Sequence, residues 1–228
     1  MRNILIILGA VAVLVVAGVG VYQWQSAPRG STPAPGPAAP AASAEEIARA
    51  RAIGDDDFTL GKADAPVTVI EYASLTCPHC ANFHVGQLPR IKAEYIDTGK
   101  VRMAFRDFPL DQAALAAAMV ARCAGKDRHA AMLGLFFTRQ QAWGGAADPI
   151  TAMARLAALA GMGEADVQAC LKKPDIEKAV LDQRLLAEKV FDIEATPTFI
   201  INGVKHSGNI TFDEFKKKVD PLLAKTAK

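Results

Sequence analysis

The chain has 228 residues, of which 51% are hydrophobic and 22% charged, with a formal net charge of +2. This is the composition of a globular protein whose length allows one large domain or two small ones. So small a net charge gives no strong positive field for nucleic acid, and we expect no nucleic-acid partner.

The N-terminus begins with a long apolar segment. Arg2 gives a short positive start, and residues 4–22 carry no charge. A helix of roughly 20 apolar residues spans a bilayer, whereas the apolar core of a cleaved signal peptide has roughly 7–15. We interpret residues 1–25 as a signal anchor, with a cleaved signal peptide as the alternative. In a bacterium, both readings place the rest of the chain outside the cytoplasm. We then expect it in the bacterial periplasm, anchored to the inner membrane by residues 4–22 or soluble after cleavage.

Two short segments follow the apolar run. Residues 26–42 are rich in proline and alanine, which is typical of a semi-extended spacer. Ser43 with Glu46 three residues later predicts a capping box, so residues 43–57 are expected to be a short helical lead-in. The acidic residues 55–57 at its end lack the spacing of a calcium loop and are interpreted as a solvated turn.

The next part of the chain predicts a strand–helix–strand unit. Residues 67–72 and 101–106 read as strands. A helix from about Pro78 to Thr98, closed by Gly99, lies between them. Such a unit predicts a right-handed crossover and parallel strands.

A helical block separates this unit from a second β-rich part. Residues 111–191 are rich in alanine, with apolar residues at helical spacing, and predict four or five helices. Residues 198–201 and 204–207 flank Asn202-Gly203, a strong hairpin signal. With a last amphipathic helix at 211–224, the pattern indicates an α/β fold with a mixed sheet.

The motif Cys77-Pro78-His79-Cys80 lies where the first strand runs into its helix. Pro78 suits the first helical position because it has no N–H to leave unpaired. Free amides and the helix dipole then favour a thiolate at Cys77, and His79 can add positive charge or a hydrogen bond. Stabilising the reduced form in this way makes the disulfide a stronger oxidant.

Zinc is the alternative for any Cys-x-x-Cys pair. A structural zinc site needs four ligands, but Cys123 and Cys170 are far apart in the sequence and in separate predicted helices. His84 is the other nearby candidate, and we favour a packing or capping role for it. We therefore expect redox chemistry, no metal, and no cofactor beyond the Cys77–Cys80 disulfide.

Residues 67–84 resemble the active-site strand and helix of the DsbA family of periplasmic disulfide oxidoreductases. Glu71, six residues before Cys77, matches the family's buried acidic residue. Thr196-Pro197 matches its cis-proline loop. The resemblance implies a thioredoxin-like fold with an inserted helical subdomain. The implied boundaries are residues 58–110 and 192–228 for the thioredoxin-like domain and 111–191 for the insertion.

The resemblance also implies a function. Cys77 would form mixed disulfides with unfolded or partly oxidised exported proteins, and Cys80 would resolve them. Glu71 would accept a proton beneath the site, and the Pro197 backbone would bind the substrate chain. The implied activity is that of an oxidase, itself reoxidised by a quinone-linked membrane oxidase of the DsbB type.

Other functions stay open. The best-known oxidases carry valine where this chain has Thr196, and threonine there is common both in isomerases and in many DsbA-like proteins. A disulfide isomerase or reductase kept reduced by a membrane electron donor is therefore an alternative. A thiol-based metal-binding or holdase module is another.

Cys123 and Cys170 form a second pair of cysteines. They could be inert buried thiols, because free cysteine packs well as a small apolar group. An oxidising compartment favours a structural disulfide, and some DsbA-like proteins carry a second, non-catalytic pair. We predict a Cys123–Cys170 disulfide.

Overall fold

The computed structural model describes residues 41–226. The predicted anchor, and all but the end of the predicted spacer, lie outside the described residues. The described residues cluster as a single compact unit. Over the range 41–226, no helix is both long enough and apolar enough to cross a membrane.

The centre of this unit is a five-stranded sheet with the order β1-β3-β2-β4-β5. The strands are β1 (Phe58–Leu60), β2 (Val67–Ala73), β3 (Val101–Asp107), β4 (Thr198–Ile201) and β5 (Val204–Ser207). β2 and β3 pair in parallel, as predicted, and the other three pairings are antiparallel. The edge strand β1 was not predicted, because three residues are too few to carry a periodic pattern.

Helices supply the rest of the unit. A helical stretch after the cysteines comprises α3 (Pro78–Asn82), η1 (Phe83–Gln87), α4 (Leu88–Ile91) and η2 (Lys92–Ile96). The inserted helices are α5 (Gln112–Cys123), α6 (Lys126–Thr138), α7 (Gln140–Gly144), α8 (Pro149–Leu159), α9 (Glu164–Cys170) and α10 (Pro174–Phe191). The outer elements are α2 (Ala44–Arg51) and α11 (Phe212–Thr226).

The predicted single helix after the cysteines contains two π-helical turns, η1 and η2. Pro89 has no N–H to donate to the carbonyl of Val85, one turn earlier, so the regular hydrogen-bond ladder cannot continue there. π-turns often stand at functional sites, and η1 carries His84.

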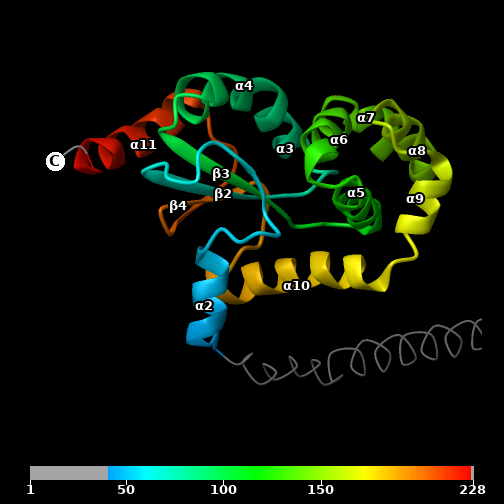
Figure 1. Ribbon diagram of the computed structural model, residues 1–228, viewed down its shortest axis with the longest axis horizontal. Helices are drawn as coiled ribbons and strands as arrows, with labels where there is room; N and C mark the ends of the chain where they lie inside the picture. The colour runs from blue at the N-terminus through cyan, green and yellow to red at the C-terminus, as the bar shows by residue number, and fades with distance from the viewer. Residues whose placement is uncertain (1–40, 227–228) are drawn as a thin grey trace, which may run out of the picture. The chain divides into compact units, whose positions relative to one another are not determined.

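Alternation along the strands gives the sheet two apolar faces. Ile70, Tyr72 and Ile200 point to the face covered by α2 and α10, where they pack with Ala187 and Phe191. The opposite face packs against the helical stretch and α11, and the helices α5–α9 gather at one end of the sheet (Figure 1). Glu71 shares this second face with Val69, two residues earlier, and therefore lies under the cysteine helix.

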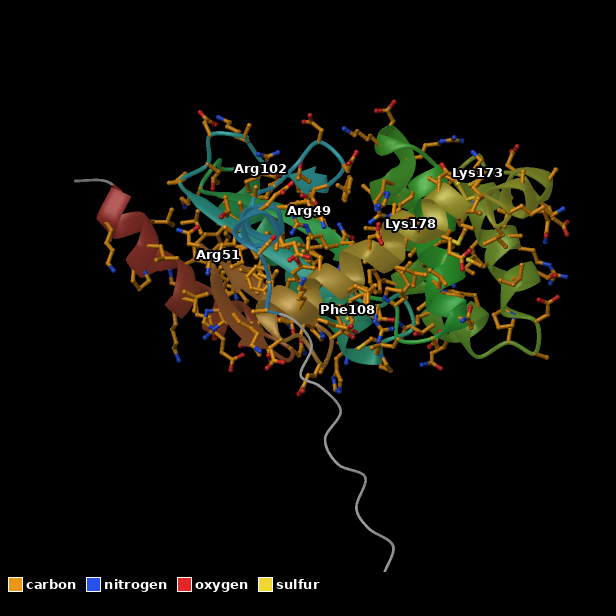
Figure 2. The ribbon with its side chains drawn as sticks, turned by 90° about the horizontal axis from the view of Figure 1, so that it is seen from below. Arg49, Arg51, Arg102, Phe108, Lys173 and Lys178 are labelled. Atoms are coloured by element: carbon orange, nitrogen blue, oxygen red, sulfur yellow. A yellow bond between two sulfur atoms is a disulfide. The ribbon has the colours of Figure 1, made fainter. Side chains whose placement is uncertain are left out.

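The outer side of α10 carries charged side chains, with Leu181 and Leu185 also exposed. Lys178 on α10, Lys173 just before α10 and Arg49 on α2 are exposed, and all three are labelled in the view from below (Figure 2). α10 thus covers the sheet with one apolar side and meets water with the other, as an amphipathic surface helix does.

The lead-in before β1 corrects one prediction. The capping box at Ser43 and Glu46 is present, but the acidic triplet is not wholly solvated. Asp57 pairs with Arg106 of β3 at 2.8 Å, and both side chains are at most 6% exposed. Arg106 also donates to the carbonyl oxygens of Ala50 and Ala52. A buried guanidinium needs an anionic partner, and Asp57 fills that need.

Candidate active site

Cys77 and Cys80 begin the helical stretch. Cys77 precedes α3 in an extended conformation, and Pro78 occupies the first helical turn. Both cysteines are free thiols, with Cys77 6% exposed and Cys80 fully buried. Cys77 is thus the thiol of the pair that a substrate can reach.

The two thiols differ sharply in acidity. The hydrogen bond from Cys80 is the main cause that lowers the pKa of Cys77 to about 5, against the opposing effect of burial. The Thr196 side chain and the backbone amides of Cys80 and His79 lower this pKa further. Burial raises the pKa of Cys80 far above that of an ordinary thiol, and the hydrogen bond to Cys77 and the charge of Glu71 raise it further. At neutral pH the pair is therefore one thiolate and one thiol.

The two residues between the cysteines are exposed. His79 contributes through its backbone amide, which lowers the pKa of Cys77. This amide belongs to the free N-terminal turn of the helix, where backbone N–H groups point toward an anion.

The loop before β4 reaches the first cysteine. The Thr196-Pro197 peptide bond is cis, and the carbonyl oxygen of Thr196 lies 3.3 Å from Cys77 Sγ. A thiol can donate to this carbonyl, whereas a thiolate carries no proton and must accept its hydrogen bonds from elsewhere. The Thr196 hydroxyl is buried and has no partner among the described residues. It is available as a donor to the thiolate.

A buried acid–imidazole pair lies beneath the cysteines. Glu71 is fully buried in β2, and its Oε2 lies 2.9 Å from His84 Nε2. The His84 side chain is 7% exposed, and its ring stacks on that of Phe137 with centroids 4.0 Å apart. Glu71 Oε1 has no hydrogen-bond partner in the described part of the chain.

Sequence reasoning missed the role of His84 as the partner of Glu71. One signal was available, because His84 lies one helical turn after Cys80 and on the same side of the helix. The sequence does not indicate that β2 places Glu71 beneath that same side of the helix.

The helical subdomain braces the active-site turn. The Gln140 side chain of α7 is buried and donates to the carbonyl oxygens of Leu75 at 2.8 Å and Cys77 at 3.0 Å. The Thr76 hydroxyl donates to Asp111, at the start of α5, at 2.7 Å. These partners are 35 to 65 positions apart in the chain, so local patterns gave no sign of them.

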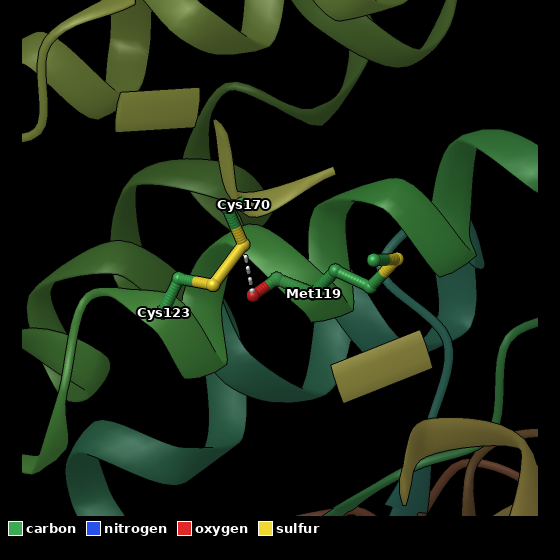
Figure 3. The surroundings of a disulfide bond; sticks show 3 residues. All are labelled: Met119, Cys123 and Cys170. Atoms are coloured by element: carbon green, nitrogen blue, oxygen red, sulfur yellow. Dashed lines mark hydrogen bonds between the residues drawn. A yellow bond between two sulfur atoms is a disulfide. The ribbon is translucent and has the colours of Figure 1, made fainter. Parts of the chain in front are cut away.

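The second pair of cysteines is a disulfide. Cys123, the last residue of α5, is joined to Cys170, the last residue of α9, with Cα atoms 6.1 Å apart. Cys170 Sγ also lies 3.2 Å from the carbonyl oxygen of Met119, drawn as a dashed line (Figure 3). A disulfide sulfur has no proton to donate, so we regard this as a close sulfur–oxygen contact. The bridge ties two helices of the subdomain together.

A metal site requires several donor side chains that converge on one point. Within the part of the chain that the structure describes, no group of three or more His, Cys, Asp or Glu side chains is arranged to hold an ion.

Comparisons with known proteins agree with this architecture. Residues 54–221 match a family model described as Thioredoxin. A Rickettsia conorii protein that bears the provisional name protein-disulfide oxidoreductase is 31% identical over 172 residues, or 75% of this chain. The match spans 62% of that relative's length, so the chain covers less than two thirds of it.

Solved structures give a closer correspondence. Alpha-DsbA1 of Wolbachia pipientis is 34% identical with a TM-score of 0.72, over 77% of this chain and 94% of that one. Oxidised BdbD of Bacillus subtilis is 25% identical with a TM-score of 0.67, over 74% of this chain and 94% of that one. The predicted thioredoxin-like fold with a helical insertion is confirmed, while its exact boundaries stay a prediction. The chain belongs to the DsbA family of thioredoxin-fold proteins.

Proposed function

We propose that this protein is an extracytoplasmic thiol-disulfide oxidoreductase that introduces disulfides into exported proteins through Cys77. The observation that carries the proposal is the asymmetry of the two thiols. The pKa of Cys77 is lowered to about 5, whereas that of the buried Cys80 is raised. A thiolate is the nucleophile and also the better leaving group in thiol–disulfide exchange.

The proposed reaction has two exchanges. A substrate thiolate attacks Cys77 Sγ of the Cys77–Cys80 disulfide, forming a mixed disulfide while Cys80 leaves as a thiolate and takes up a proton. A second substrate thiolate then attacks the substrate sulfur of the mixed disulfide, and Cys77 leaves as a thiolate. The substrate dithiol loses two electrons and the enzyme disulfide gains them.

The direction of electron flow follows from the same asymmetry. Helix amides and Cys80 stabilise the Cys77 thiolate, which exists only in the reduced enzyme, so the disulfide is the more oxidising. Thr196 supports the alternative, an isomerase or reductase kept reduced by a membrane electron donor, because its free hydroxyl can also bind a substrate backbone.

We propose the remaining roles from where the residues lie in the chain and in the fold. Glu71 exchanges the proton of Cys80, and the Thr196-Pro197 loop binds the substrate chain beside Cys77. Residues 4–22 hold the protein at the inner membrane of the periplasm, where a DsbB-like quinone-linked oxidase returns Cys77 and Cys80 to the disulfide. The redox-active disulfide is the reacting group.

The test is the redox state of Cys77 in cells, trapped by rapid alkylation. An oxidase has Cys77 mainly in the disulfide, and loss of its membrane oxidase turns it into the thiol. A pair found mainly reduced overturns the oxidase direction in favour of an isomerase or reductase.

Two variants distinguish the oxidoreductase from the alternative, a thiol-based holdase or metal-binding module. Cys77→Ala and Cys80→Ala each remove thiol–disulfide exchange but leave a chaperone surface in place. Protection of unfolded clients that survives both changes contradicts the enzyme function.

A further inference from the structure

We propose that Glu71 and His84 form a relay that carries the proton of Cys80 to and from solvent through a hollow beside α6. This inference rests on the proposed function and adds to it a positioning residue, His84, and an exit route. The reaction requires such a route, because Cys80 takes up a proton when it leaves the disulfide and loses it when the disulfide forms again.

Cys80 cannot exchange that proton with bulk water directly. Its side chain is fully buried, at the point where the first helical turn packs on the sheet. It donates a hydrogen bond to Cys77 in the reduced pair. In the resolving step Cys80 gives up its proton and attacks Cys77 Sγ of the mixed disulfide, so the bond from Cys77 to the other sulfur breaks and that sulfur leaves as a thiolate. Another group must therefore accept the proton as the bond forms.

Glu71 is the first group of the relay. It lies close enough to Cys80 for its charge to raise the pKa of that thiol, and one carboxylate oxygen, Oε1, has no partner within residues 41–226. A buried acceptor without a donor is costly, and a proton passed from Cys80 would satisfy it. The other oxygen, Oε2, is already bonded to His84.

His84 is the second group and the outlet. Imidazole can accept a proton on one ring nitrogen and release one from the other. Nε2 lies 2.9 Å from Glu71 Oε2, while Nδ1 has no hydrogen-bond partner in the described range. The ring stands between the buried carboxylate and a space that water can enter.

That space is a hollow of about 120 Å³ between β1, the helical stretch and α6. Its volume is enough for a few water molecules, each of which occupies about 30 Å³ in the liquid. The residues around it include His84, Leu60, Leu88, Leu133, Gly134 and Phe137. Water there would meet His84 without passing Cys77, so proton exchange and substrate binding use separate approaches.

The other charged groups near His84 are already engaged. His129, Arg106 and Asp107 line a small gap that adjoins the ring. Arg106 is paired with Asp57, and Asp107 with Arg122. Burial lowers the pKa of His129, which keeps that imidazole neutral at neutral pH. Among these groups, Glu71 is therefore the one that is hydrogen-bonded to His84.

Packing is the simpler explanation for His84, because its ring stacks on Phe137. A phenyl ring would fill the same space and keep the stacking, but it could not carry a proton. His84→Phe therefore separates the two explanations. His84→Ala adds a second test, since it opens room for free imidazole.

The experiment uses the full chain, reduced and held in detergent, with oxidised glutathione as the disulfide. Acid quenching and mass spectrometry separate two steps, formation of the mixed disulfide at Cys77 and its resolution by Cys80. We expect His84→Phe to leave the first step unchanged and to slow the second on the order of 100-fold at pH 7, within the range for proton-transfer catalysis. The defect should shrink at high pH, where hydroxide takes the proton.

The hollow is tested in the same assay. Gly134 lies on α6 in the lining of the hollow, and a Cβ added there meets nothing within 4 Å, so Gly134→Leu adds a bulky side chain at its wall. Ala131→Leu, at an exposed position of the same helix outside the lining of the hollow, is the matched control. Imidazole should restore resolution in His84→Ala, and adding Gly134→Leu should abolish that rescue.

The outcomes are distinct. Resolution in His84→Phe within about twofold of the parent rate, far from the expected effect, overturns the relay, as does His84→Ala that imidazole does not rescue. Rescue compares one variant with itself, so a folding defect cannot imitate it. Failure of the first step in the unaltered protein would instead overturn the proposed function.

Discussion

The chain places two pairs of cysteines in opposite environments. Cys77 and Cys80 are at the N-terminal end of a helix and remain free thiols in the structure. Cys123 and Cys170 each end a helix and are joined in a disulfide. The partial positive charge of a helix N-terminus favours a thiolate, and the partial negative charge of a C-terminus disfavours it. The end of the helix that carries the cysteine thus separates a reactive pair from a structural one.

The largest expected contrast is in activity. Cys77→Ser should abolish oxidation of a reduced, unfolded substrate, because serine offers no thiolate for the mixed disulfide. The double variant Cys123→Ser/Cys170→Ser should keep the rate within about threefold, as for distant and independent sites. Both are measured by the appearance of disulfide-bonded substrate under identical buffer conditions. Comparable losses in the two variants would contradict the division into reactive and structural pairs.

The pH dependence of alkylation should distinguish the two thiols of the reactive pair, Cys77 and Cys80. Cys77 of the reduced protein should react with iodoacetamide at half its maximal rate near pH 5, because its pKa is lowered to about 5. Cys80 should not react until the protein unfolds, since burial raises its pKa. Mass spectrometry of the modified peptides separates the two thiols. A midpoint for Cys77 near that of a free thiol would remove the basis for the oxidase proposal.

The same lowered pKa has a consequence for stability. A group whose pKa is depressed in the folded state stabilises it fully above the unfolded pKa, about 8.5 for a thiol, and loses that effect as pH falls through the folded value. The reduced protein should therefore have a higher free energy of unfolding than Cys77→Ser at high pH, and this difference should decline as the pH falls from about 8.5 to about 5. Urea unfolding under reducing conditions measures the free energy of unfolding of both proteins. A difference between them that does not change with pH would contradict the prediction.

The structural pair should matter for stability rather than chemistry. Its two cysteines are 47 positions apart, so removing the bridge frees a long loop in the unfolded chain. Cys123→Ser/Cys170→Ser should lower the free energy of unfolding by about 2–4 kcal/mol. Denaturant unfolding with Cys77 and Cys80 blocked isolates this effect. An unchanged midpoint would show that the bridge constrains little.

The smallest expected effect concerns Gln140, which joins the helical subdomain to the turn that carries Cys77. Gln140→Leu removes the donor from two buried carbonyls, those of Leu75 and Cys77. This should lower the free energy of unfolding by about 1–3 kcal/mol. Gln141→Leu, on the exposed neighbouring position, is the control and should be nearly neutral. Equal losses in the two variants would mean that the brace does not support the cysteine turn.

Features confined to a few neighbouring residues could be predicted from the sequence. The hairpin signal at Asn202-Gly203 is an example, since both residues adopt the positive φ, 43° and 85°, that its tight turn requires. The capping box at Ser43 and the placement of Pro78 at the start of α3 are of the same kind. The parallel pairing of β2 and β3 followed from the handedness of a strand–helix–strand unit.

The surroundings of the reactive pair were decided by tertiary structure. The sequence by itself determined that Cys77 and Cys80 share one helical turn, because backbone geometry sets that spacing. It did not determine that Glu71 faces His84, that Gln140 holds the Cys77 carbonyl, or that Asp57 is buried against Arg106. Each of these contacts joins elements that meet only when helices pack on the sheet. Burial then makes their pairing obligatory, since a buried polar group left alone costs more than a paired one.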